Sequence, residues 1–487
     1  MSWQTHAMLP AEFESICTSL TARYRALISE DVEGLAVPDL LSAEEQVVRF
    51  VRELGLSLLQ VFVDVRAAQA KATRQPCACG RLPDVHRSTQ WPRKTLLGAV
   101  VVRDPYVHCR ICHGSDRPLH AYLGTDRETW SLDVQQAAVD LASDESCGKA
   151  VAKLERHHPG VEMERTTALR LLHDHGHYAR EFIDDKLRGA RELAELPRGL
   201  RSEGADELEV EFDAGMIPVA TLEPIKVAEG QQSERTPVRG LPKRRKATRW
   251  EEVKAGLVQK PGQVDRLYAL RPTGGLVESF DDLFALACMK GWTEQTQVRG
   301  LADGALHIRP RMQEAFNVGN FRFILDRPHC KEHLSEAGAA LDRPDGVTVQ
   351  GWATAALAKL EAGAAGEVVA ELTAAWQASG PDEASRNDRL RLEAGYFDRN
   401  RDAVAYAEYR SHGWSTASSE IESGHRHLVQ ARLKISGAWW HPDHVDDILA
   451  LRMVKANGWW DEYWQTRRRA WRKRAEGFAE PRRQLAV

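Results

Sequence analysis

The sequence predicts a multidomain α+β protein that contains a mixed β-sheet flanked by helices. Its 487 residues exceed what one hydrophobic core usually organises, and an apolar fraction of 43% is enough for several domains to fold. Helical periodicity and β-like alternation fall in separate blocks of the chain. In the central block, strands come first and then helix and strand alternate, which favours a mixed sheet with helices on its faces.

Changes in periodicity and composition predict six regions. Apolar residues recur at three- and four-residue spacing in EEQVVRFVRELGLSLLQVFVDV, whereas LEVEFDAGMIPVATL alternates like a strand. Pro159-Gly160 separates two helical runs and favours a helix-turn-helix arrangement. The regions are an amino-terminal helical region (1–75), a zinc-binding module (76–125), a helical, helix-turn-helix-like region (126–200), the sheet-containing core (205–345 and 405–465), a helical insertion (346–404) and a basic carboxyl-terminal tail (466–487).

Composition also indicates the compartment. No stretch approaches the roughly 20 uncharged apolar residues that a membrane-spanning helix needs, and the start, MSWQTHAMLPAEFES, lacks the basic and apolar segments of a secretion signal. We therefore expect a cytoplasmic protein with no membrane partner. Eight cysteines in such a chain are better explained as reduced thiols and metal ligands than as a disulfide framework.

Four of the cysteines form two close pairs that predict a structural Zn²⁺ site. Cys77 and Cys79 lie in PCACG, and Cys109 and Cys112 lie about 30 residues further on, in HCRIC. Two pairs joined by one or two hairpins can supply four thiolates to a tetrahedral ion, which leaves no open position for substrate. The one-residue spacer of the first pair is tight, so a nearby histidine could replace one ligand. The histidines in question are His86, His108 and His113. Unrelated thiols are the alternative.

Basic residues are concentrated locally although the net charge is only -4. They gather in 235–249 and 464–483, and local patches rather than the sum set the field that a polyanion meets. A solvated face or tail is the alternative for each run. The residues predicted to bind DNA are Lys243, Arg244, Arg245, Lys246 and Arg249, with Arg426, Arg432 and Lys434 further on. Four tryptophans are expected to pack rather than to stack on bases: Trp439, Trp440, Trp459 and Trp460.

Three acids are candidates for a catalytic metal site. Asp213 closes a predicted strand before Ala-Gly, a flexible exit that allows a metal or phosphate to approach, and Asp303 closes another strand beside a glycine. Carboxylates at strand ends face the crevice where ligands usually bind. Glu422 lies in a helix-like run that would align it with His425, Arg426 and Val429. Such oxygen ligands suit Mg²⁺ or Mn²⁺, although turns and solvated helix positions explain each acid singly.

Longer motifs give the chain a family resemblance. The central and carboxyl-terminal motifs are EFDAGMIPV, RWEEVKAGLV, LADGALHIRP, ILDRPHCKEHL, ESGHRHLVQARLKISGAWW and ALRMVKANGWWDEYW. PCACG and TLLGAVVVRDPYVHCRICHGSDRPLHAYLG belong to the amino-terminal part. Across about residues 70–465 the chain resembles the ISKra-type bacterial insertion-sequence transposases. This resemblance implies an RNase H-like catalytic core of the DDE type.

The resemblance also assigns roles to residues. It places the first acid at Asp213, the second at Asp303 and the glutamate at Glu422, and it matches Asp326 and His329 to an Asp-x-x-His element that supports the ligands. His333, one helical turn on, would join that support.

The chain departs from the family at two points near these acids. Ala214 stands after the first acid, where the family has a glycine. A Gly-Ser-Gly run before the glutamate is replaced by Ala417-Ser418-Ser419-Glu420. Glu420 is therefore an alternative for the third ligand.

The expected function is metal-dependent DNA transposition. The enzyme would hydrolyse phosphodiesters at transposon ends and join the freed 3′-hydroxyls to target DNA, with two metal ions about 3.5–4 Å apart activating the attacking oxygen and stabilising the leaving one. Its partner would be double-stranded DNA, bound by a homodimer or higher oligomer associated with the nucleoid. Two alternatives are a domesticated transposase acting as a DNA-binding regulator and a non-mobile RNase H-like nuclease.

Overall fold

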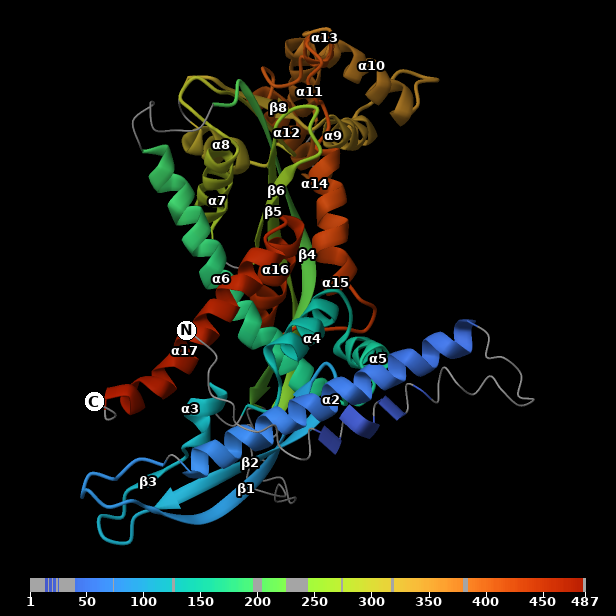
Figure 1. Cartoon of the computed structure of the whole chain (residues 1–487). Helices are drawn as coiled ribbons and strands as arrows, with labels where there is room; N and C mark the ends of the chain where they lie inside the picture. Colours follow the sequence, from blue (N-terminus) through green and yellow to red (C-terminus); the bar gives the residue numbers. More distant parts are fainter. Residues whose placement is uncertain are drawn as a thin grey trace, which may run out of the picture. The chain divides into compact units, whose positions relative to one another are not determined.

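The structure, a computed structural model, forms two compact units. The first comprises residues 1–172 and 461–487, and the second comprises residues 173–460. The residues that the structure describes are 40–72, 74–124, 128–195, 204–224, 244–272, 275–316, 319–379 and 384–484, with a few more between 14 and 25. Figure 1 shows the course of the chain.

The first unit contains a small antiparallel sheet covered by a long helix. The sheet has the order β1-β2-β3, and its strands are β1 (Asp84–Thr95), β2 (Gly98–His108) and β3 (Ser115–Asp116). Helix α2 (Leu40–Ala72) is the predicted amino-terminal helix and lies along this sheet (Figure 1). Val63 and Ala67 of α2 pack against Val100 and Val102 of β2, whose inward side chains alternate with exposed ones as in a half-buried strand.

Further helices complete the first unit. Serine hydroxyls at positions 131 and 146 accept hydrogen bonds from the first turns of α4 and α5, so the local sequence sets both helix starts. The helices are α3 (Leu119–Leu123), α4 (Leu132–Asp144), α5 (Cys147–His157), the beginning of α6 (Arg165–Ala194) and all but the first residue of α17 (Trp460–Gln484). The predicted break at Pro159-Gly160 lies between α5 and α6.

The second unit is built on a five-stranded mixed sheet of order β6-β5-β4-β7-β8. Strand β4 pairs in antiparallel fashion with β5 and in parallel fashion with β7; β5 pairs antiparallel with β6, and β7 pairs parallel with β8. The strands are β4 (Glu207–Pro224), β5 (Arg244–Gln259), β6 (Arg266–Arg271), β7 (Gln297–Ala302) and β8 (Phe321–Leu325). The predicted mixed sheet flanked by helices is thereby confirmed.

The two faces of β4 follow the predicted alternation. Leu208, Val210 and Phe212 are buried, and the Phe212 ring lies 4.8 Å from the ring of Phe280 in helix α7. Glu209, Glu211 and Asp213 occupy the opposite face, because successive side chains of a strand alternate. The acids of this strand therefore share one side of the sheet.

Helices cover both faces of this sheet and extend beyond it. They are α7 (Leu276–Met289), α8 (Ile308–Ala315), α9 (Arg327–Ala340), α10 (Val349–Glu361), α11 (Ala365–Ala378), α12 (Ala384–Arg399), α13 (Tyr406–Ser411), α14 (Ser419–Gly424), the π-helical η3 (His425–Gln430), α15 (Ala431–Leu433) and α16 (Pro442–Ala456). Within the predicted helical insertion, α10 and α11 are separated at Gly363, which has a positive φ of 81°. Helices α10 to α13 gather at one end of the unit (Figure 1).

Among the described residues, no helix combines the length and the apolar character that crossing a bilayer requires.

Candidate active site and metal site

The strand register places Asp213 and Asp303 side by side. The parallel ladder of β4 with β7 ends where Glu211 pairs with Leu301. Asp213 and Asp303 follow two positions later on their respective chains, on the same face as that last pair. Since neighbouring strands lie about 4.8 Å apart, two carboxylates that are 90 residues apart in sequence meet at one edge of the sheet.

Asp326 extends this row to a third strand. Strand β7 pairs with β8 up to Ala302 and Leu325, so the next residues on each chain are Asp303 and Asp326. Three aspartates thus stand in register on three neighbouring parallel strands: Asp213 where the pairing of β4 with β7 ends, and the other two directly after the carboxyl ends of β7 and β8. Ligands of such sheets bind at the carboxyl ends of parallel strands.

Asp213 does not close its strand as expected, because β4 continues to Pro224. Only the pairing with β7 ends near it. Burial raises the pKa of Asp213, and the charge of Asp303 raises it further, while His425 and His329 act in the opposite direction. The site is therefore short of positive charge, which is the electrostatic condition that a bound cation relieves.

The backbone around Asp303 is held by two hydrogen bonds. Its carboxylate accepts from the Ala305 amide at 2.9 Å, and its carbonyl accepts from the Tyr396 hydroxyl at 2.7 Å. Gly304 has a φ of 76°, and a Cβ there would lie 2.3 Å from Leu325. The glycine beside this acid is thus required both by conformation and by space.

Asp326 joins two distant segments of the chain. Its carboxylate accepts hydrogen bonds from the His329 amide and ring and from the amide and hydroxyl of Ser418, at 2.6 to 3.0 Å. Burial by itself would raise the pKa of Asp326, but these hydrogen bonds outweigh it and lower the pKa. The carboxylate raises the pKa of His329 to about 9 through their shared hydrogen bond. Asp326 thus secures the segment that leads into α14, and its acceptor sites are occupied.

Glu422 lies on α14 and faces outward. Its side chain is 56% exposed and forms an ion pair with Arg426. His425 and Val429, expected on the same face, are buried. The difference arises because the helix changes to π geometry at His425, which alters the angular spacing of side chains.

Glu420, the alternative third ligand, points elsewhere. Its carboxylate pairs with Arg266 of β6 at 2.8 Å. The two acids are two residues apart on a helix, so they face in different directions. Glu420 thereby links α14 to the sheet.

The described residues contain two groups of at least three ligand side chains whose ligand atoms all lie within 4.8 Å of one another. Asp213, Asp303 and Glu422 do not form such a group. For the three acids to share ions, the Glu422 side chain has to leave Arg426.

Gly215 and His425 are positions whose roles the sequence reasoning did not foresee. A Cβ at Gly215 would lie 2.1 Å from Cε1 of the His425 ring, so the imidazole occupies the space that a side chain would fill. His425 is 1% exposed, and burial lowers its pKa. The glycine after Asp213, expected to admit a metal or phosphate, thus admits the helix that carries Glu422.

Glu211 is a second residue that the sequence reasoning did not single out. It is 1% exposed, and one carboxylate oxygen accepts from the Ile421 amide at 2.7 Å. Burial raises its pKa to about 8, with the charges of Glu209 and Glu420 adding to the effect. Its place on the strand face of Asp213 was the available signal, because an acid on an inward face needs a partner.

His333 lies in a separate cluster. Its ring stacks on Tyr396 at 3.8 Å between centroids, and its Nδ1 lies 2.7 Å from Glu393. His333, Glu336 and Glu393 form one of the two groups with metal-ligand spacing. Arg389 already pairs with both glutamates, so the cluster has its own cation. Through Tyr396, His333 supports the Asp303 backbone.

The predicted DNA-binding residues differ in accessibility. Lys243 lies outside the described residues, whereas the other basic residues of its segment are exposed on β5: Arg244, Arg245, Lys246 and Arg249. From Arg244 onward this segment belongs to strand β5. Arg426 and Lys434 are exposed. Arg432 is fully buried, with its guanidinium 4.5 Å from the Trp440 ring, and from there it does not reach a phosphate.

The four predicted cysteines converge in the first unit. The sulfur of Cys79 lies 2.9 Å from Cys77 and 3.6 Å from Cys109, and that of Cys112 lies 3.4 Å from Cys77. A tetrahedral ion with Zn–S bonds of about 2.3 Å needs sulfurs roughly 3.8 Å apart. The group comprises four cysteines and none of the three alternative histidines. The sulfurs therefore need to move slightly apart to fit the ion.

Backbone geometry prepares one of these sulfurs for metal binding. Amides of Cys112 and Ile111 point at Cys109 and lower the pKa of its thiol to about 6. The hydrogen bond with Cys79 raises the pKa of Cys77. Thiols that lie this close together can bind a metal such as zinc, because metal binding displaces the thiol protons and the ion is held by the thiolates.

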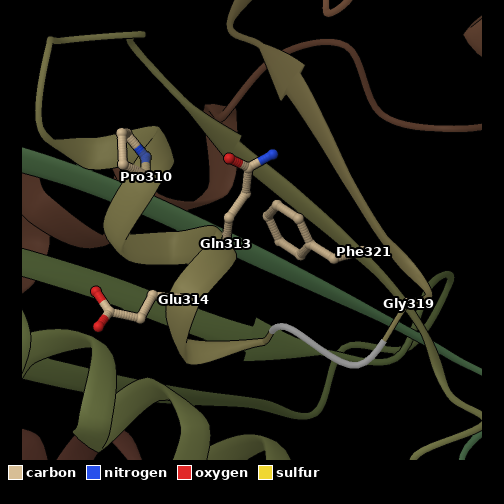
Figure 2. A pocket seen from close by; sticks show the side chains of 5 residues that line it. All are labelled: Pro310, Gln313, Glu314, Gly319 and Phe321. Carbon is tan, nitrogen blue, oxygen red and sulfur yellow. The ribbon is translucent and has the colours of Figure 1, made fainter.

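A surface cavity of about 490 Å³ lies away from the acids. It is lined by residues of α8 and of the start of β8, shown in Figure 2: Pro310, Gln313, Glu314, Gly319 and Phe321. Phe321 is at the opposite end of β8 from Asp326. With a single carboxylate in its lining, the cavity offers no set of groups for acid–base or metal chemistry.

Comparison of the chain with protein-family models, curated proteins and solved structures gave no match.

Proposed function

We propose that this chain is a DNA transposase of the DDE type, with an RNase H-like catalytic core in the second unit. The observation that carries the proposal is the register that sets Asp213 beside Asp303, where the parallel pairing of β4 with β7 ends. Two neighbouring carboxylates, one of them buried enough to have a raised pKa, are a suitable start for a divalent metal site.

The arrangement of the sheet supports the proposed fold. Numbered along the chain within the sheet, the strands lie in the order 3-2-1-4-5, and the second strand is antiparallel to the others. An RNase H-like domain has this order, with its first acid on the first strand and its second on the fourth. Asp213 on β4 and Asp303 after β7 stand at those places.

Each part of the site has a role in the proposed reaction. Mg²⁺ or Mn²⁺ held there would activate the attacking oxygen and stabilise the leaving oxygen of a phosphodiester. Asp213 and Asp303 would hold the metal, and Glu422 would join them once its side chain leaves Arg426. Asp326 keeps α14 near the sheet through Ser418, and the cationic His329 beside it attracts the phosphate backbone.

Cleavage of DNA by the purified full-length protein tests this function. The substrate is the DNA that flanks the gene, incubated with Mg²⁺ or Mn²⁺ and followed by nicking and strand joining. Asp213→Asn, Asp303→Asn and Glu422→Gln should each reduce product at least about a thousandfold without weakening DNA binding. Glu420→Gln is the matched control, because its partner is Arg266, and it should retain activity.

The same assay separates the alternatives. A wild type that binds the flanking DNA but cuts nothing in either metal would be a regulator, and the proposal would then be wrong. Cleavage of branched DNA without joining would instead indicate a nuclease. Retained strand joining by Asp303→Asn would refute the assignment of the acids.

A further inference from the structure

Strands β4 and β5 continue as a two-stranded ribbon beyond the five-stranded sheet. Their ladder runs from Ala214–Lys254 to Pro224–Arg244, whereas β7 pairs with β4 only up to Glu211. Strand β6 pairs with β5 only from Lys254 onward. The ribbon therefore begins directly after the acid at position 213 and extends about 35 Å at roughly 3.3 Å per residue.

One face of the ribbon is packed and the other is open. Ile217 and Val219 are fully buried. On the opposite face, Met216 is 44% exposed, Leu222 63% and Trp250 57%. A tryptophan this exposed is unusual because a monomer gains by burying it, and it marks an interaction surface.

The open face combines the aromatic side chain with cations. Side chains of a strand alternate, so Trp250, Thr248, Lys246 and Arg244 point to the same side. All four are exposed. Nucleic-acid-binding surfaces commonly combine these two kinds of group: cations contact phosphates, and aromatic rings contact bases.

The ribbon is also fixed in place. The Trp440 backbone bonds to its edge, donating to the Pro218 carbonyl at 3.3 Å and accepting from the Ala220 amide at 2.8 Å. The Lys246 ammonium lies 4.8 Å from the Trp439 ring centroid. Because this edge is already held in place, binding a ligand does not carry the entropy cost of ordering a free loop.

The acids of the ribbon are each paired with a cation, and one of them lies on the open face: Glu252, half exposed, pairs with Lys254 at 2.9 Å. Arg245 pairs with Glu223 at 3.5 Å, and the Arg249 guanidinium pairs with Glu251 at 2.5 Å. Both arginine side chains are more than half exposed, and such pairs contribute little stability, so the arginines can exchange their partners for phosphates.

We propose that the open face of the β4–β5 ribbon, which is the face opposite to that of Asp213, is a DNA-binding arm, with Trp250 contacting bases and Arg244 and Lys246 contacting phosphates. This proposal rests on the proposed function for its choice of DNA as the partner. A two-stranded ribbon fits the major groove, which is about 12 Å wide. The path from Trp250 back to Ala255, the partner of Asp213, is five residues, or about 17 Å. Along the strand, Trp250 therefore lies about half a DNA helical turn from the acids.

Binding of a fluorescent 30-base-pair duplex by the full-length protein tests the arm. Ca²⁺ replaces Mg²⁺ so that no cleavage occurs, and affinity is measured across a range of salt concentrations. Trp250→Ala should weaken binding about tenfold with an unchanged salt slope, because the indole is uncharged. The double variant Arg244→Ala/Lys246→Ala should weaken binding and flatten the slope by about 2, because two phosphate contacts are lost.

Two controls match these variants in exposure. Val264, 91% exposed in the connection between β5 and β6, is replaced by alanine as an apolar control, and Arg311, exposed on α8, is replaced by alanine as a charge control. Both should bind as the wild type does. Thermal unfolding checks that every variant folds, and Trp250→Phe should recover most of the affinity because it restores an aromatic ring.

The outcomes separate this proposal from the proposed function. Affinities of Trp250→Ala and the double variant within twofold of the wild type would overturn the arm, even if the wild type cuts DNA. If these variants bind DNA about tenfold more weakly but the wild type never cuts DNA, the result would support the arm and count against the transposase. If the variants lose affinity for single-stranded RNA but not for duplex DNA, the arm binds a different ligand, and the proposal would fail.

Discussion

The two candidate metal sites are assembled in different ways. The cysteine site uses ligands from two turns joined by the hairpin of β1 and β2, and its four sulfurs already lie within 4.8 Å of one another. The acidic site uses β4, β7 and a helix more than a hundred residues further on, and Glu422 is paired with Arg426. A site made from local turns is complete when its hairpin forms, whereas one made from distant segments depends on the whole fold.

The contrast predicts that loss of the cysteine site should have the largest effect. Wild-type protein should contain about one zinc per chain by elemental analysis, and Cys109→Ser/Cys112→Ser should contain none. Because the metal contributes folding free energy, amides of β1–β3 should lose most of their protection from hydrogen exchange, while those of β4 and β7 keep theirs. Zinc-free wild type with a protected hairpin would contradict the account.

The acidic site should be disrupted most readily by a side chain at Gly215, which lies against the His425 ring. Gly215→Ala puts a Cβ where the His425 ring lies, so we expect the second unit to lose about 3 kcal/mol of its free energy of unfolding. Chemical denaturation measures this loss. Gly189→Ala, in helix α6 with open space around it, is the control and should be neutral or slightly stabilising. Equal stabilities of the two variants would show that the imidazole is not wedged there.

Glu211 provides a smaller, pH-dependent test. Its folded pKa of about 8 lies above the value of an exposed glutamate, so the folded state holds a proton that the unfolded state has released. Wild-type stability should therefore fall as the pH rises from 5 to 8. Glu211→Gln removes this dependence. Between pH 5 and pH 8, its free energy of unfolding should rise by about 2 kcal/mol relative to that of the wild type. Parallel unfolding curves for both proteins would mean that Glu211 is ionised when folded.

Titration of His329 should give the smallest change in stability, and this change should occur at a higher pH than that of Glu211. Its folded pKa of about 9 is above the ordinary 6.5, so its ion pair with Asp326 stabilises the fold fully below pH 6.5 and is lost as the pH rises through 9. The side chain is 40% exposed, and screening reduces the expected loss to about 1 kcal/mol. His329→Gln should lack this decline, and a decline equal to that of the wild type would locate the titration elsewhere.

The sequence predicted more of the cysteine site than of the acidic one. Ligand spacing is local, so Cys77, Cys79, Cys109 and Cys112 were all identified from short motifs. Asp213 and Asp303 were found because strand alternation is also local. Their side-by-side placement depends on the β4–β7 register, which no local pattern contains.

Other features could not be read from periodicity. The helix after Glu422 was predicted with α-helical spacing, but the π geometry at His425 turns the following residues to another face. The burial of Arg432 under Trp440 follows from tertiary packing, which overrides the usual exposure of arginine. Likewise, no apolar pattern predicted a strand in the basic run from Arg244, because its place in the sheet is set by pairing with β4.

The most direct test of the central claim is the binding of Mn²⁺ by the second unit's acids. Electron paramagnetic resonance of full-length protein, with its zinc content measured, counts the Mn²⁺ ions bound as metal is added. The wild type should bind Mn²⁺, and Asp213→Asn/Asp303→Asn should bind it at least tenfold more weakly, with zinc content unchanged. Equal Mn²⁺ binding by the two proteins would contradict the assignment of these neighbouring carboxylates as the metal site.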